Sequence, residues 1–172
     1  MQIPKKSPPW LYKAITYLGQ SEVAGTKHNP IIVKFSQRLG LLIRDDETPW
    51  CATFVGSCLE EACIRSTRSA LALSYRNYGI ELGGPVIGAI AYMTRKNKAG
   101  KIIGGHVGFV MGLRSDGAIM LLGGNQGDKV SIAAFPKSRI IGYRWPHKTP
   151  VPYDNLMSFA LNGTPTFSEK ED

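Results

Sequence analysis

The sequence has no apolar run long enough to cross a lipid bilayer. A membrane-spanning helix needs about 20 predominantly apolar residues, and no segment of this 172-residue chain approaches that length. The N-terminal stretch MQIPKKSPPWLYKAITYLGQ also lacks the continuous apolar core and small-residue cleavage site of a signal peptide. We therefore expect a protein that is synthesised in the cytoplasm, does not insert stably into membranes, and needs another route of delivery if it acts elsewhere.

Cysteine and histidine are scarce, with three residues of each. Cys51 and Cys58 are seven positions apart, roughly 10 Å along a helix, which is too far for a disulfide. The odd number of cysteines favours free thiols in a reducing compartment. The cysteine spacings do not match structural zinc sites, and His28, His106 and His147 supply no paired ligands. We expect no metal and no other cofactor.

Acidic residues are also few, with 13 Asp and Glu against 21 Lys and Arg and a net charge of +8. A basic surface attracts polyanions, which include nucleic acid, anionic lipid headgroups and carboxylate-rich polymers such as the bacterial cell wall. Charge alone does not choose among these partners. The function has to be read from a specific site.

The length and the order of patterns predict one domain over residues 1–150, in a monomer, followed by a tail over residues 151–172. Helical periodicity predicts helices over 8–20 and 31–39, a third from about Thr48, and a helix or irregular turn over 66–78. From residue 83 the pattern changes to short strands over 86–95, 105–113, 118–123, 129–135 and 139–145. Helices followed by strands joined through tight turns predict an α+β fold, with the helices on one face of an antiparallel meander of five or six strands.

Cys51 has the most informative position, within 45-DDETPWCATFVGSCLEEACI-64. Thr48 suits an N-cap and Pro49 suits the first helical position, so Cys51 is expected in the first turn. Unpaired backbone N–H groups and the helix dipole at that end favour a thiolate. Cys51 is therefore a candidate nucleophile, whereas Cys58, two turns further along the helix, is expected to be a buried core thiol.

A thiolate nucleophile needs a base, and His106 in 104-GGHVGFVMG-112 is the best candidate. It lies within a predicted strand, whereas His28 lies in a loop and His147 in a proline-rich segment. A third polar group usually orients such a histidine. Asn125 follows the next strand in 122-LGGNQGD-128 and is the first choice, with Asp128 as the alternative. This loop lacks the spacing of a phosphate-binding P-loop.

These motifs together resemble a known family. PWCATFVGSCLEEA, GHVGFVMG, GGNQGDKVSIAAFP and GYRWP are similar to the CHAP and NlpC-type cysteine amidases and peptidases of bacterial cell-wall turnover, particularly small phage and prophage endolysins. The similarity runs from about Trp10 to Trp145. It implies a papain-like α+β fold and hydrolysis of amide bonds in peptidoglycan peptides, with Cys51 as nucleophile, His106 as base and then acid, and Asn125 orienting the imidazole.

Other positions near the motifs carry weaker expectations. Asp46, Trp50 and Gln126 are candidate substrate-binding residues, although a solvated loop is the favoured interpretation of Asp46 and Trp50 would equally serve the core. Cys63 stands where similar proteins tend to have glycine after the helix, so we expect a left-handed backbone there with strain of about 1 kcal/mol.

Two other functions remain compatible with the sequence. One is a different thiol acyl-transfer enzyme on the same fold, such as a deamidase, a toxin or a lipid acyltransferase. The other, less favoured, is a basic nucleic-acid-binding module, for which no recognition helix or RNA-stacking motif is evident. The expected partners are peptidoglycan peptide stems, with delivery by a holin or a secretion system and no nucleic acid. The sequence leaves open which peptidoglycan bond is cut, the host range, and whether the protein is a phage lysin or a secreted effector.

Overall fold

Helices precede strands in the chain, as predicted. The structure is a computed structural model that describes residues 7–152, so nearly all of the predicted tail lies outside the described residues. The helices are α1 (Pro9–Ile15), α2 (Pro30–Arg38), α3 (Cys51–Glu61) and the 3₁₀ segments η1 (Ala72–Asn77) and η2 (Lys137–Arg139). The strands are β1 (Ile80–Leu82), β2 (Ile90–Lys96), β3 (Ile102–Leu113), β4 (Ile119–Gly123), β5 (Ser131–Phe135) and β6 (Gly142–Trp145).

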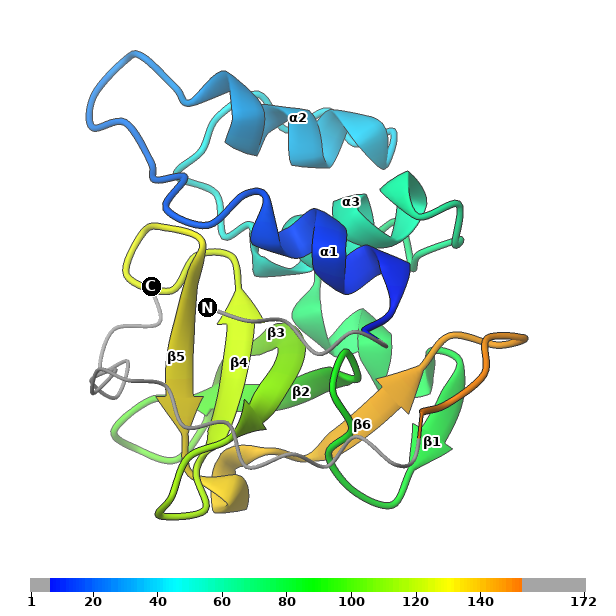
Figure 1. The fold of residues 1–172 in the computed structure, drawn as a ribbon. Coiled ribbons are helices and arrows are strands. Elements are labelled where there is room, and N and C mark those ends of the chain that lie inside the picture. Colours follow the sequence, from blue (N-terminus) through cyan, green and yellow to red (C-terminus); the bar gives the residue numbers. More distant parts are fainter. Residues whose placement is uncertain (1–6, 153–172) are drawn as a thin grey trace.

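The strands of the described chain form one antiparallel sheet of six strands in the order β1-β6-β2-β3-β4-β5. The α+β prediction is confirmed, and strands β2 to β5 form the predicted meander. The meander does not continue into β6, which pairs with β2 on the far side (Figure 1). Pro136 has no N–H for a sheet ladder, and η2 then carries the chain to Ile141, whose N–H donates to the Tyr92 carbonyl at 3.0 Å.

The third helix is buried all round rather than on one stripe. Every residue from Cys51 to Leu59 is buried, because α1 and α2 cover the sides of α3 that the sheet does not (Figure 1). The Phe54 ring links these layers, lying 5.5 Å from Phe35 of α2 and 6.4 Å from Phe109 of β3. A helix held on all sides provides a rigid support for the residue at its first turn.

The start of α3 differs from the expected start. Trp50, not Thr48, is the N-cap, and the first intrahelical bond runs from the Phe54 N–H to the Trp50 carbonyl at 2.9 Å. The reason is that the Asp45 carboxylate accepts the Thr48 N–H at 2.7 Å, which holds residues 45–48 in a local turn. Cys51 is still in the first turn, as the first helical residue.

The end of α3 carries the strain expected from the sequence. Cys63 is exposed and has a φ of 58°. The Cys63 N–H donates to the Glu60 carbonyl at 3.0 Å and the Ile64 N–H to the Leu59 carbonyl at 2.9 Å, the paired bonds of a helix end that favours glycine at the left-handed position.

Replacing this residue with glycine is expected to stabilise the protein. Cys63→Gly removes the left-handed penalty of a side chain, about 1 kcal/mol, and part of that gain is lost to the greater entropy of the unfolded chain. Urea denaturation under reducing conditions should show a higher midpoint with an unchanged slope. Cys63→Ala is the matched control, because alanine keeps the Cβ atom. An equal rise of the urea midpoint in both variants would show that left-handed backbone strain at residue 63 is not the cause.

Candidate active site

The Cys51 sulfur is buried at the start of α3, where the backbone N–H groups of the first turn have no intrahelical partners. The residue is 5% exposed. Burial opposes ionisation of the sulfur, but the hydrogen bond and charge of His106 and the hydrogen bonds from two backbone N–H groups together outweigh it and lower the pKa of the Cys51 thiol. These N–H groups are those of Val107 and Ala52. This environment suits a nucleophilic thiolate.

The imidazole of His106 lies in a buried position on β3, opposite Met93 of β2. Its ring stacks on Phe135 at a centroid distance of 5.5 Å and an interplanar angle of 26°. Its Nε2 atom lies 3.0 Å from Oε1 of Gln126. The structure thus brings Cys51, His106 and Gln126 together from α3, β3 and the loop after β4.

The amide of Gln126 defines how the imidazole is protonated. Its Nε2 group donates to the Ser131 carbonyl at 2.6 Å and to the Leu121 carbonyl at 3.3 Å, so its oxygen is the atom that faces His106. The His106 Nε2 atom must then carry a proton and donate it to that oxygen. In the neutral ring the other nitrogen, Nδ1, is left as the basic atom that can take the proton of Cys51.

Gln126 occupies the place that was predicted for Asn125. Asn125 adopts a left-handed backbone with a φ of 57°, and the chain reverses there so that the longer Gln126 side chain folds back under Gly123. A Cβ atom at Gly123 would lie 2.6 Å from Gln126 Oε1 and 3.2 Å from His106 Nε2. The alternative, Asp128, is exposed in the next turn. The run of glycines around Gln126 was the sequence signal for such a tight fold.

Gln126 was also expected to bind substrate, and its contacts are against this. The residue is 3% exposed, and both its oxygen and its amino group are engaged by protein groups. Its side chain is therefore a positioning group for His106.

Trp50 connects the start of α3 to the loop of Gln126. The residue is 2% exposed, and its indole N–H donates to Glu22 Oε1 at 2.6 Å. The ring packs directly on Gly124, where a Cβ atom would lie 2.5 Å from it. Trp50 is thus a core residue that fixes the two segments against each other, which is the second of the two roles that the sequence allowed.

Asp46 is likewise a structural residue. Its side chain is fully buried, and it accepts the N–H groups of Val23 and Asn29 at 2.9 and 2.8 Å and lies 2.8 Å from Nδ1 of His28. Although burial opposes ionisation, these hydrogen bonds lower the pKa of the Asp46 carboxyl. The carboxylate braces residues 23–29, which favours the structural interpretation of Asp46 over contact with a substrate amine.

Within residues 7–152, no group of three or more His, Cys, Asp and Glu side chains gathers in a way that would hold a metal ion. No helix in the same part of the chain has the length and apolar character required to span a membrane.

The fold is similar to that of a solved Staphylococcus aureus protein described as similar to a lipoprotein of the NLP/P60 family. The two share 15% sequence identity with a TM-score of 0.48, over 81% of this chain and 41% of that one. No protein-family model and no curated protein matches the chain.

The pKa values of Cys51 and Cys58 are shifted in opposite directions. The pKa of Cys51 is lowered as described, burial raises the pKa of Cys58 well above its usual value, and Cys63 is exposed. Because the thiolate is the reactive form, iodoacetamide labelling of Cys51 should persist to lower pH than the reaction of free cysteine, with the exposed Cys63 as an accessible site in the same sample. Peptide mapping by mass spectrometry would follow both sites in one sample.

His106→Ala should shift the labelling profile of Cys51 to higher pH, because the hydrogen bond and charge of the imidazole are lost and burial remains. The profile of Cys63 serves as the internal control. A Cys51 profile that is identical with and without the imidazole would contradict the proposed contact.

Proposed function

We propose that this protein is a cysteine hydrolase that cleaves an amide bond in the peptides of peptidoglycan. The observation that carries the proposal is the row of three side chains, with the Cys51 sulfur against His106 and the His106 Nε2 atom 3.0 Å from Gln126 Oε1. A thiol at a helix start, an imidazole beside it and an amide that orients the imidazole are the parts that thiol acyl transfer requires.

The reaction would proceed in two steps through an acyl-enzyme. The Cys51 thiolate attacks the carbonyl carbon, and the unpaired N–H groups at the start of α3, that of Cys51 first among them, stabilise the oxyanion. The protonated His106 then gives its proton to the leaving amine, and the C–N bond breaks. In the second step His106 takes a proton from water, which attacks the thioester and releases the carboxylic acid and the free thiol.

The peptidoglycan substrate is supported by the sequence. The resemblance to CHAP and NlpC-type enzymes extends across all the motifs that carry these residues. The net charge of +8 suits a polymer whose peptides carry free carboxylates. In this proposal the protein is a small phage or prophage endolysin, or an effector, that acts on the wall after a holin or a secretion system has given it access.

Removing the sulfur is expected to abolish the activity. Cys51→Ala should leave purified cell wall uncleaved with an unchanged circular dichroism spectrum, whereas Cys58→Ala should retain activity because that thiol is a core residue. Mass spectrometry of the released muropeptides would identify the bond. A new acyl conjugate instead of hydrolysis products would favour an acyltransferase, and undiminished lysis by Cys51→Ala would refute the mechanism.

Removing the Gln126 amide should impair catalysis without abolishing binding. We expect Gln126→Ala to lower kcat roughly 10- to 100-fold, a part of the acid–base contribution of His106, with little change in KM. Asn125→Gly is the matched control, since glycine tolerates the left-handed backbone, and it should stay within a few-fold of the parent. If Asn125→Gly lowered kcat more than Gln126→Ala, then Asn125 and not Gln126 would orient the imidazole.

A further inference from the structure

The hairpin formed by β2 and β3 extends beyond the strands on either side of it. β2 pairs with β6 over residues 90–92, and β3 pairs with β4 over residues 109–113. Beyond these stretches the register pairs β2 and β3 with each other, out to Lys96 opposite Ile102. The far end of the hairpin, residues 94–104, therefore projects from the sheet as a two-stranded arm, which we call the hairpin arm.

The turn at the end of the hairpin arm is held by backbone and side-chain hydrogen bonds. The Asn97 N–H donates to the Lys101 carbonyl at 2.9 Å. The Asn97 side-chain oxygen accepts the N–H groups of Ala99 and Lys101 at 3.1 and 3.0 Å. Gly100 has a φ of 77°, a conformation that glycine adopts without steric cost. The arm thus holds the lysines of its turn in a defined arrangement.

The hairpin arm carries cations and no carboxylate. Lys96, Lys98 and Lys101 are exposed, and the sequence has no acidic residue between Glu81 and Asp116. Within residues 7–152, no carboxylate forms an ion pair with any of these three lysines. The arm therefore has a positive charge that suits an anionic surface.

Two successive isoleucines of the hairpin arm expose more than half of their surface. Ile102 is 53% exposed and Ile103 is 56% exposed. On β2 the register advances by one residue, from Arg95 to Lys96, while on β3 it advances by two, from Gly104 to Ile102. Ile103 is therefore the extra residue of a β-bulge, which has no partner in the ladder and interrupts the alternation of side chains.

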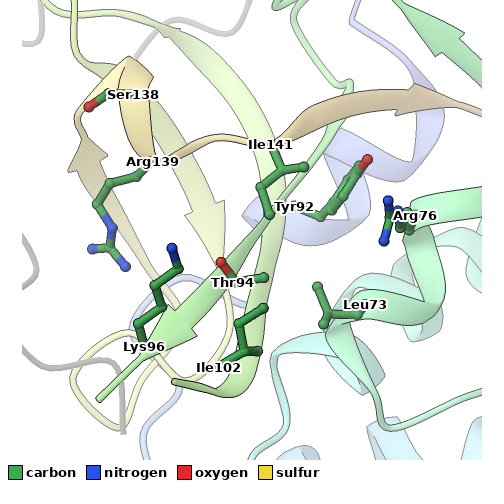
Figure 2. A pocket seen from close by; sticks show the side chains of 9 residues that line it. All are labelled: Leu73, Arg76, Tyr92, Thr94, Lys96, Ile102, Ser138, Arg139 and Ile141. Carbon is green, nitrogen blue, oxygen red and sulfur yellow. The ribbon is translucent and has the colours of Figure 1, made fainter. Parts of the chain in front are cut away.

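A groove of about 900 Å³ continues this surface on one side of the hairpin arm. Figure 2 shows Lys96 and Ile102 at the end of the hairpin, and Arg139 and Ile141 on the segment that joins β5 to β6. Ile141 is 50% exposed, and no residue of the lining is acidic. Cations and exposed apolar side chains are therefore combined across both the arm and the groove.

The groove lies on the sheet face away from His106. In the register His106 is opposite Met93, whereas Tyr92 and Thr94, the neighbours of Met93, line the groove. Successive residues of a strand point to opposite faces. A ligand on this face would leave the side of the sheet that carries Cys51 uncovered.

We propose that the hairpin arm and the groove beside it bind the surface of an anionic phospholipid bilayer. The lysines contact headgroup phosphates, and Ile102 and Ile103 enter the boundary between the headgroups and the acyl chains. This association is peripheral, and salt weakens it because the charges are exposed. The proposal does not depend on the reaction at Cys51. If the protein cleaves peptidoglycan, the bilayer would hold it beside the wall with its catalytic face open.

The isoleucines favour a lipid surface over a soluble polyanion. A phosphate polymer or a nucleic-acid duplex is bound mainly through its charges, and exposed isoleucines add nothing to such a contact. Single-stranded nucleic acid needs exposed aromatic rings for base stacking, and Tyr92, the aromatic residue of the groove, is 4% exposed. An anionic bilayer is the polyanion that interacts favourably with both the lysines and the isoleucines.

Vesicle binding by the full-length protein tests the proposal. The protein should co-sediment with vesicles of equimolar phosphatidylglycerol and phosphatidylcholine but not with vesicles of phosphatidylcholine alone. Lys98→Gln/Lys101→Gln should weaken this binding about 25-fold, because each lysine near an anionic surface contributes about fivefold. Lys27→Gln/Lys34→Gln is the matched control, with the same change in charge at exposed sites before α2 and within it, and it should lose much less.

The apolar contact is tested separately at the bulge. Ile103→Ser should weaken vesicle binding at least about fourfold, the contribution of one methylene-sized group removed from water. Leu42→Ser, at a residue that is 90% exposed between α2 and α3, is the matched control and should bind like the parent. Circular dichroism spectra of all variants should match that of the parent, since the changed side chains lie on the surface.

A tryptophan on the hairpin arm would report directly on insertion. The natural tryptophans of the chain, Trp10, Trp50 and Trp145, are at most 2% exposed, so an added indole dominates any change in emission on binding. The emission of Ile103→Trp should shift to the blue with anionic vesicles and be quenched by brominated acyl chains. The emission of Leu42→Trp should do neither.

Three results would overturn the inference. One is equal vesicle binding by the parent and Lys98→Gln/Lys101→Gln, and another is an equal loss in the lysine control variant. The third is a loss of binding to duplex DNA and to vesicles alike in the lysine variant, with Ile103→Ser binding vesicles as the parent does, because that pattern describes a site for any polyanion. None of these results bears on cleavage at Cys51, so the proposed function is tested independently.

Discussion

The packing of the Trp50 ring on Gly124 is the contact on which the geometry of the candidate site depends. It joins the first turn of α3 to the loop after β4, and these two segments deliver Cys51 and Gln126 to opposite sides of His106. The contact is possible only because residue 124 has no side chain. The hydrogen bond from Trp50 to Glu22 and the brace formed by Asp46 then hold the outer side of the same region.

Cys51 is buried, but protein groups supply hydrogen bonds to its sulfur in place of water. A desolvated thiol normally resists ionisation, as Cys58 shows seven residues further along the same helix. Cys51 differs in being at the helix end, where backbone N–H groups are free to donate, and in facing an imidazole. Two thiols on one helix therefore have opposite pKa shifts, because only Cys51 faces the imidazole and the N–H groups that offset burial.

The sequence predicted the parts of this protein whose determinants are local. Helical periodicity, turn residues and alternation located most elements, and the position of Cys51 at a helix start followed from its neighbours. The pairing of β6 with β2 is not local, because it depends on how Pro136 and η2 redirect the chain. The choice of Gln126 over Asn125 depends on the backbone of the loop, since one left-handed residue changes which side chain turns inward.

The residues next to the candidate nucleophile show a related limit of prediction from local sequence. Asp46 and Trp50 are polar or amphipathic and stand near Cys51 in the chain, which made them reasonable ligands for a substrate. Their hydrogen bonds instead go to the loop before α2 and to Glu22, partners that are distant in sequence. Here the side chains of Asp46 and Trp50 hold the segments around Cys51 in place.

The left-handed end of α3 has a consequence for handling and engineering of the protein. Cys63 is the one exposed thiol among the three cysteines of the chain, and it projects from the opposite end of the helix that begins with Cys51. In air, chains should couple to each other through this residue while the sulfur in the first turn stays shielded. The same position offers a point for attaching a dye or a surface tether beyond the far end of α3, a helix of 11 residues that is therefore about 16 Å long.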